Sequence, residues 1–391
     1  MKKIIFYTLV SIILNGCVSM GGVARFSESE VESVNIFQSE NVRTSTSGMV
    51  HLDLTQGVGS NRFEQKDLVD TLFFLPLETN QESVFGSIEK ILFSDDRIII
   101  KDGDGNFLIF DITGRFISCS KKGNGPGEVG KLWDIAFDEE QQQIIAYQSD
   151  FLNFYDKNGN FICNKKCPIM SKELFLTSWG YLFFQDTYIN YHLGIDADNL
   201  LLLSDKNFSV FGKGGSTCKQ NGVVSSLTNV FKIGKDFIVS NKLNDTIFQV
   251  SGKNIYAKYV INYGSSNIIN SDKDKIMQSG LFYFNGRFFE NSQTQLFQFW
   301  SYKSGLCFTF RDKKNGNVMG GTIIRNNERE LPLCIPNTCG VYNDYFVSFN
   351  TPYKGMHYNS AAVSEAENAK LAQLSEEDNC ILIFYKVKEL R

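Results

Sequence analysis

Apolar and polar residues alternate over short runs along most of this chain, and clusters of Gly, Asn and Asp separate the runs. The pattern is clearest in FLIFDITGRFIS and FLNFYDKNGNFIC, which lie between residues 107 and 163. In each, an alternating strand is followed by a polar turn with glycine and a second alternating strand, which is typical of a β-hairpin. The repeat distance of about fifty residues is that of one β-propeller blade.

Similar runs continue to the end of the chain at residues 173–186, 199–212, 230–241, 244–264 and 295–318, followed by VYNDYFVSFN and ILIFYKVK. Strands this short and this evenly spaced predict a closed all-β architecture. We expect an all-β, six-bladed β-propeller with four-stranded antiparallel blades. Pairing of an N-terminal strand, at 49–54 or 72–77, with ILIFYKVK would close the ring and protect its edges.

Two segments depart from the strand pattern. Residues 270–288 read as an insertion within a blade, with a helical turn. SEAENAKLAQLSEEDN at 364–379 predicts a helix, in which Ser364 caps the N-terminus and Glu367 completes a capping box.

The N-terminus has the features of an export signal. Lys2 and Lys3 precede a short apolar run, and Leu14-Asn15-Gly16-Cys17 places a small residue before a cysteine. This resembles a bacterial lipoprotein signal, in which Cys17 becomes the lipidated first residue; a plain cleaved secretory signal is the alternative. Lipid on Cys17 would hold the protein to a membrane without a spanning helix.

The chain therefore divides into a signal peptide at 1–16, a flexible tether at 17–48 and the propeller at 49–391. The tether is assigned because its residues are rich in Ser, Glu, Asn, Gly and Thr without a sustained period. VSMGG, which follows Cys17, lacks the acidic run that often accompanies surface display. We therefore expect attachment to the outer membrane, facing the periplasm.

Composition narrows the classes of partner. The net charge is −4, and it becomes more negative once Lys2 and Lys3 are removed. A chain with this net negative charge lacks the excess of basic residues that is typical of proteins that bind nucleic acid. Aromatic residues make up 14% of the chain, which suits stacked sheets with broad rings between them.

Eight cysteines follow Cys17, and export would allow disulfides to persist. Cys163 with Cys167 and Cys334 with Cys339 are the local candidates for pairing, although strand cysteines are often only small buried apolar residues. A zinc site at CNKKC is disfavoured, since no histidine lies near it in the sequence.

The loop KKGNGPGE superficially resembles a phosphate-binding loop. A P-loop requires Gly-Lys-Ser/Thr leading into a helix, whereas an alternating strand follows here. A tight path between two blades is the favoured interpretation, so the loop residues are assigned a structural role: Gly123, Asn124, Gly125, Pro126, Gly127 and Glu128. Asp102, Asp104 and Asn106 have alternate calcium-type spacing, but the EF-hand positions after them hold Phe107 and Thr113, which favours a polar turn.

These segments together resemble a family of six-bladed β-propeller lipoproteins common in Bacteroides-type bacteria, similar in blade pattern to NHL-type propellers. The pieces that carry the resemblance extend from about residue 70 to the C-terminus and include FLPLETNQESVFGSIEKILFSDDRIII, IFDITGRFIS, KKGNGPGEV, FYDKNGNFI, NDTIFQV, YAKYVINYG and EEDNCILIFYKVKEL. Val129 departs from the pattern, because a tyrosine commonly follows the glutamate in the family. The resemblance implies the fold and carries over no catalytic residues.

Two functions remain open. No compact catalytic motif is present, which favours a non-enzymatic, monomeric binding or scaffolding protein for a protein, peptide or glycan partner in the cell envelope. The alternative is a lactonase- or esterase-like hydrolase with calcium held at the propeller axis by residues from different blades. The first interpretation needs no cofactor, and neither assigns catalytic residues.

Overall fold

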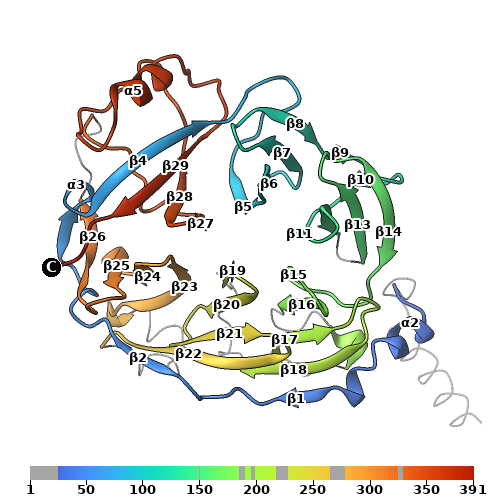
Figure 1. Ribbon diagram of the computed structural model, residues 1–391. Helices are drawn as coiled ribbons and strands as arrows, with labels where there is room; N and C mark the ends of the chain where they lie inside the picture. The colour runs from blue at the N-terminus through green and yellow to red at the C-terminus, as the bar shows by residue number, and fades with distance from the viewer. Residues whose placement is uncertain are drawn as a thin grey trace, which may run out of the picture.

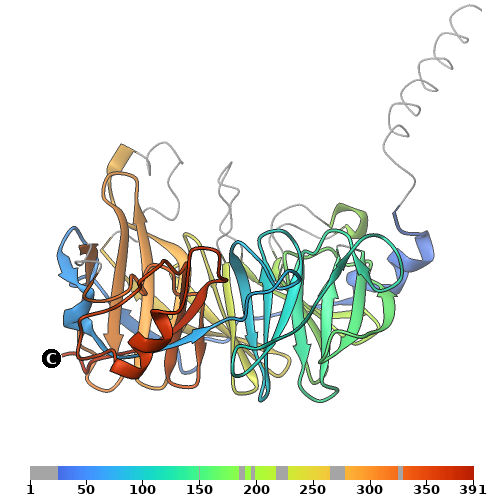
Figure 2. The same cartoon turned by 90° about the horizontal axis from the view of Figure 1, so that it is seen from above.

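The alternating segments form six antiparallel sheets that stand as blades around a central axis (Figure 1), so the predicted six-bladed propeller is confirmed. The structure is a computed structural model, and it describes residues 25–148, 150–184, 190–194, 199–216, 228–264, 278–324 and 329–391. Seen from the side, the ring is a disc whose strands run between its two faces (Figure 2).

Each blade begins with the strand nearest the axis and continues outward. Blade 1 contains β5 (Ile88–Phe93), β6 (Arg97–Asp102), β7 (Phe107–Asp111) and β8 (Phe116–Cys119). Blade 2 contains β11 (Asp134–Asp138), β12 (Gln143–Tyr147), β13 (Phe151–Asp156) and β14 (Phe161–Lys166). Blade 3 contains β15 (Glu173–Thr177), β16 (Gly180–Phe184), β17 (Asn199–Ser204) and β18 (Val210–Ser216).

The second half of the ring follows the same order. Blade 4 contains β19 (Thr228–Ile233), β20 (Asp236–Asn241), β21 (Thr246–Ser251) and β22 (Asn254–Asn262). Blade 5 contains β23 (Tyr283–Glu290), β24 (Thr294–Ser301), β25 (Gly305–Asp312) and β26 (Val318–Ile324). Blade 6 contains β27 (Gly340–Tyr342), β28 (Tyr345–Asn350), β29 (Ile381–Val387) and the N-terminal strand β4 (Val69–Pro76).

The ring is closed by both ends of the chain. Strand β4 pairs antiparallel with β29 along its length, with Leu75 opposite Leu382 and Phe73 opposite Phe384. The rings of Phe73 and Phe384 stack, with centroids 4.4 Å apart. The predicted closure of the ring by pairing with the C-terminal strand is therefore confirmed for residues 72–77. The other candidate, residues 49–54, does not pair with that strand.

The chain before β4 forms a belt along the outer edges of three blades. Strands β1 (Glu40–Val42), β2 (Val50–Asp53) and β3 (Arg62–Glu64) each add in parallel to the outermost strand of blades 3, 4 and 5, respectively. These blades therefore have five strands, one more than expected. In the described part of the chain, the outer strands β8 and β14 of blades 1 and 2 have no such addition.

The belt also revises the expected tether. Helix α2 (Glu28–Ser33) has a complete capping box between Ser27 and Glu30, and 3-10 helix η1 (Ile36–Gln38) follows it. Val34 and Ile36 are buried in the cluster between blades 2 and 3. The folded body therefore extends upstream of residue 49. Val34 and Ile36 pack against the ring, but the polar residues around them gave this segment the composition of a flexible tether. Residues 17–24 lie outside the described residues.

Short helical elements also lie between strands in the described residues, namely α3 (Gln65–Leu68), η2 (Tyr191–Leu193) and α5 (Glu365–Leu371). Helix α5 begins at the predicted cap, where the Ser364 hydroxyl accepts from the Glu367 N–H at 3.2 Å. The predicted capping box is wrong, since the Glu367 carboxylate accepts instead from the N–H of Phe74 in β4 at 2.8 Å. In the described residues, no helix is long and apolar enough to cross a membrane.

A separate apolar cluster fills each of the six interfaces between neighbouring blades. Aromatic rings span these gaps, as between Phe107 of blade 1 and Tyr155 of blade 2, whose centroids are 5.0 Å apart. All seven described cysteines after Cys17 are free thiols, and both local disulfide candidates are unpaired. Cys167, Cys307, Cys334 and Cys380 are buried, and Cys307 lies within strand β25.

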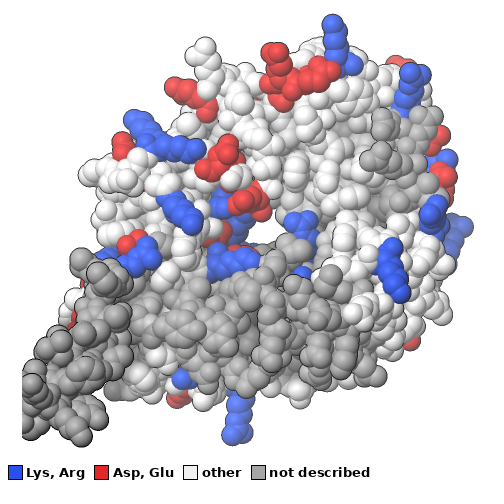
Figure 3. Space-filling view, turned by 180° about the vertical axis from the view of Figure 1, so that it is seen from behind, with Lys and Arg blue, Asp and Glu red and all other residues white. Residues whose placement is uncertain are grey.

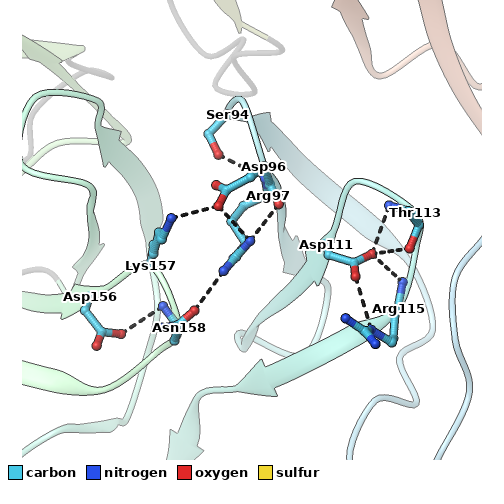
Figure 4. Close-up of polar contacts among 9 residues, drawn as sticks. All are labelled: Ser94, Asp96, Arg97, Asp111, Thr113, Arg115, Asp156, Lys157 and Asn158. Atoms are coloured by element: carbon cyan, nitrogen blue, oxygen red, sulfur yellow. Dashed lines mark hydrogen bonds and ion pairs between the residues drawn. The ribbon is translucent and has the colours of Figure 1, made fainter.

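The outer hairpins of blades 1 and 2 are closed by the same aspartate turn (Figure 4). One carboxylate oxygen of Asp111 accepts from the N–H groups of Thr113 and Arg115. Asp156 accepts in the same way from Asn158 and Asn160. The two blades are linked close to these turns, where Lys157 pairs with Asp96 at 2.7 Å.

These turns predict an acid-dependent loss of stability. Burial raises the pKa of the Asp111 and Asp156 carboxyls, but their hydrogen bonds outweigh it and hold both below the ordinary value of 3.8. Each carboxylate therefore stabilises the fold above about pH 4, and the contribution is lost as the pH falls through the lower folded-state value. Asp156→Ala should cost about 1–2 kcal/mol at pH 7 and almost nothing near pH 2. Urea unfolding across pH measures this; a pH-independent cost, or an equal cost for the exposed-turn control Asp95→Ala, would contradict it.

Candidate functional site

The innermost strands β5, β11, β15, β19, β23 and β27 surround the axis. One face of the molecule is hollowed at its centre, and both basic and acidic side chains gather around the hollow (Figure 3). Charged residues are usually expelled from the interior of a fold, so their position on innermost strands calls for a reason. Four residues of the innermost strands of three successive blades lie close together, and we term them the axial cluster: Lys90, Asp134, Glu173 and Phe175.

The centre of the axial cluster is a buried carboxylate. Asp134, the first residue of β11, keeps only 3% of its side chain exposed, and its two oxygens accept from Lys90 Nζ of β5 at 2.8 and 2.7 Å. Oδ2 also accepts from the backbone N–H of Leu174 in β15 at 2.7 Å. One side chain therefore connects the innermost strands of blades 1, 2 and 3.

The ammonium group of Lys90 has a second partner. It lies 4.4 Å from the centroid of the Phe175 ring, which is a cation–π contact. Phe175 is otherwise part of the apolar cluster between blades 3 and 4. The lysine is thus held in place by a carboxylate on one side and an aromatic face on the other.

Glu173 supplies a group that titrates near neutral pH. The surrounding protein desolvates its carboxyl, and together with the Asp134 charge this outweighs the attraction of Lys90 and raises the pKa to about 7. The residue as a whole is half-buried. Near neutral pH this carboxyl can therefore accept a hydrogen bond from a ligand when it is ionised, or donate one when it is protonated.

A β-bulge brings one more charge to the same place. Ile88 pairs with Asp102 and Lys90 with Lys101, so Glu89 is an extra residue in β5. Its side chain is 50% exposed and forms an ion pair with Lys101. Bulges commonly redirect a side chain next to a functional site.

The raised pKa of Glu173 leads to a prediction about stability. A carboxyl whose folded-state pKa lies above its ordinary value of 4.5 destabilises the fold once it ionises, so the penalty grows between pH 4.5 and 7 and is complete above pH 7. Glu173→Gln should therefore raise the Tm at pH 8 and leave it unchanged below pH 4.5. Thermal melting at several pH values measures this. An equal change at both ends of the range would mean that Glu173 does not titrate as described.

The glycine-rich loop predicted from the sequence lies elsewhere. Gly123, Asn124, Gly125, Pro126, Gly127 and Glu128 connect β9 (Lys121–Lys122) with β10 (Glu128–Val129), two short parallel strands between blades 1 and 2. Glu128 Oε2 accepts from the Gly125 N–H at 2.8 Å. A Cβ at Gly123, which has φ of 154°, would lie 1.9 Å from that same oxygen. The loop is thus folded around its own glutamate.

The other residues singled out from the sequence do not belong to the axial cluster. Cys17, the predicted lipidation site, lies outside the described residues. Asp102 closes the β6–β7 turn by accepting from the Asn106 backbone and side chain. Within the described ranges, no three His, Cys, Asp or Glu residues converge to hold a metal ion, and the axial-calcium alternative stays a prediction.

Sequence reasoning missed the axial cluster, although Lys90 and Asp134 both lie in segments that were recognised. Lys90 and Asp134 are 44 residues apart, and their meeting depends on how two blades pack. The available signal was a charged residue within an otherwise apolar innermost strand, as in SIEKILF.

The fold and the axial cluster together define a β-propeller with a polar centre. The chain belongs to the family described as "Domain of unknown function (DUF4934)", which matches residues 50–386. None of the curated proteins is similar enough to match it. Among solved structures, a putative exported protein from Bacteroides fragilis is similar, with a TM-score of 0.68 and 17% identity over 87% of this chain and 100% of that one. A duf4221 family member from Bacteroides vulgatus has a TM-score of 0.46 and 10% identity, covering 83% and 99% of the two chains.

Proposed function

We propose that this protein is an exported binding protein of the cell envelope, tethered through lipid on Cys17, which holds a polar peptide, protein or glycan partner at the propeller axis. The observation that carries the proposal is the axial cluster. Lys90, Asp134 and Glu173 are charged or titratable groups on three innermost strands, beside the ring of Phe175. Such a mixture of donors, acceptors and an aromatic face is suited to a hydroxyl- or amide-rich ligand.

A purely structural role explains these charges less well than ligand binding does. A buried ion pair seldom stabilises a fold more than apolar residues of similar volume would. Apolar clusters fill all six interfaces between blades, so the blades have apolar packing without the charges of the axial cluster. The B. fragilis structure of the same fold is described as an exported protein, which agrees with the signal-like N-terminus of this chain.

Site-specific photo-crosslinking in cells tests the proposal. The full chain would carry benzoylphenylalanine either at Glu89, beside the axial cluster, or at Ile162 on the outer strand β14. The two positions are matched in exposure, at 50% for the Glu89 side chain and 47% for Ile162. We expect crosslinked species from position 89 and none from position 162. Equal products at both positions, or none at 89, would contradict binding at the axis.

The anchor is tested separately. Labelling with a radioactive fatty acid should mark the wild-type chain in the membrane fraction, and Cys17→Ser should abolish both the label and the membrane association. A released but unlabelled wild-type chain would instead support the plain secretory signal.

A further inference from the structure

The innermost strand of blade 5, β23, lies across the ring from β11 (Figure 1), and it carries a further charged residue, Arg287. Arg287 belongs to a segment that the sequence suggested to be an insertion, and that expectation is wrong for residues 283–288, which form most of β23. Phe284 pairs with Phe299 and Phe288 with Phe297. Three residues, 285–287, therefore lie opposite one residue of β24, and this wide bulge displaces Arg287 from the regular sheet.

The bulge is held in a fixed shape. Asn285 Nδ2 donates to Gln298 Oε1 at 2.5 Å, and Asn285 Oδ1 accepts from the Arg287 N–H at 3.0 Å. The Ser240 hydroxyl of blade 4 donates to the Gly286 carbonyl at 2.7 Å. Both sides of the bulge are thus bonded to buried groups, so the backbone at Arg287 is held in place before any ligand arrives.

The guanidinium group of Arg287 has few partners for a half-buried cation. Nη1 donates to the Thr338 carbonyl at 3.3 Å, and within the described part of the chain no carboxylate forms an ion pair with it. Burial lowers the pKa of this group. A guanidinium has five N–H donors, and the single bond to Thr338 uses one of them, so the others are available to a ligand.

Arg287 and the axial cluster are joined through blade 6. Thr338, which accepts from Arg287, is two residues before Gly340 of β27. A Cβ on Gly340 would lie 3.3 Å from Ile91, the neighbour of Lys90 in β5. Blade 6 therefore contacts Arg287 on one side and β5, the strand of Lys90, on the other.

We propose that Arg287 is an anion-binding residue, which receives a carboxylate or phosphate group of the ligand held at the axis. The inference rests on the proposed function, because it places one anionic group on the same ligand that contacts the axial cluster. The planar fork of arginine suits both oxyanions, since each offers two oxygens in one plane. An acidic sugar or an acidic peptide would meet this requirement, whereas a neutral glycan would not.

Titration calorimetry of the detergent-solubilised full chain tests this inference. The probes are glucuronate, glucose and inorganic phosphate at constant ionic strength in chloride. We expect glucuronate or phosphate to bind at least about tenfold more tightly than glucose. The arm that binds identifies the source of the oxyanion. Failure of both anions to bind more tightly than glucose would overturn the inference.

Variants separate binding from folding. Arg287→Gln should remove the preference for the anion, and Arg287→Lys should retain only part of it, because lysine lacks the fork. The control is Arg97→Gln, which removes an equal charge from a side chain that is only 15% exposed and paired with Asp96; it should bind like wild type. Without probe, Arg287→Gln should melt at or above the wild-type temperature, since it removes a half-buried charge for which the described residues supply no carboxylate partner. A lower Tm with unchanged anion binding would overturn the proposal in favour of a structural role.

The outcome is distinguishable from failure of the proposed function. Crosslinks at position 89 without Arg287-dependent anion binding would leave axial binding supported and overturn only the inference about Arg287. Arg287-dependent anion binding without crosslinks would support this inference and count against the envelope partner.

Discussion

Removal of strand β29, by ending the chain at Cys380, should abolish cooperative unfolding of the whole ring. This strand pairs with β28 on one side and β4 on the other, so it holds both ladders of blade 6. Its side chains also supply both adjoining interfaces: Ile383 and Tyr385 face blade 5, and Leu382 and Phe384 face blade 1. Each large apolar side chain lost from a core costs about 2–5 kcal/mol, and the sum exceeds the 5–15 kcal/mol that stabilises a typical domain.

Circular dichroism during urea titration measures this result. A chain ending at Lys388 is the matched control, because it keeps all of β29 and the bond from the Lys388 N–H to the Leu68 carbonyl; it should retain a sigmoidal transition. The single substitution Phe384→Ala should give an intermediate effect of about 3–5 kcal/mol. A cooperative transition in the chain ending at Cys380 would show that five blades are stable as an open ring.

The second large effect is expected at Asp134. Asp134→Ala removes the acceptor for both the Lys90 ammonium and the Leu174 N–H. Since Lys90 and Asp134 keep only 16% and 3% of their side chains exposed, the orphaned charge remains in a desolvated place. Loss of one partner of such a pair costs about 3–5 kcal/mol. Urea unfolding at pH 7 measures the free energy of unfolding.

A double variant separates the pair from its surroundings. Lys90→Met with Asp134→Asn removes both charges, keeps an amide oxygen for the Leu174 N–H, and places an apolar chain against Phe175. It should lie within about 1 kcal/mol of wild type, and a double-mutant cycle then gives a large coupling energy. Recovery would mean that the fold does not need these charges, as the proposed function requires. If the double variant is as unstable as Asp134→Ala, the pair is a structural link between blades.

Some features of the site could have been inferred from the sequence and others could not. The apolar runs indicated strands at residues 88–93 and 131–140, and the charges of Lys90 and Asp134 within them were visible. Nothing local indicated that the two side chains meet, because this depends on the angle and register between two separate sheets. The position of Arg287 was still harder to predict, because a bulge is defined only by the pairing register with the neighbouring strand. That register pairs Phe284 with Phe299 and Phe288 with Phe297.

The sequence by itself determined the blades of this protein, because alternation, turn residues and the Asp111- and Asp156-type turns act over fewer than ten residues. It also indicated how the ring closes, since a ring leaves two strand edges that only the chain ends can cover. The tertiary structure alone decided the belt of β1, β2 and β3, whose partners are some 170 to 260 residues away and whose few apolar residues fit several edges. It alone also decided the polar centre, because the axis is where residues from separate blades converge, and no short-range pattern encodes that convergence.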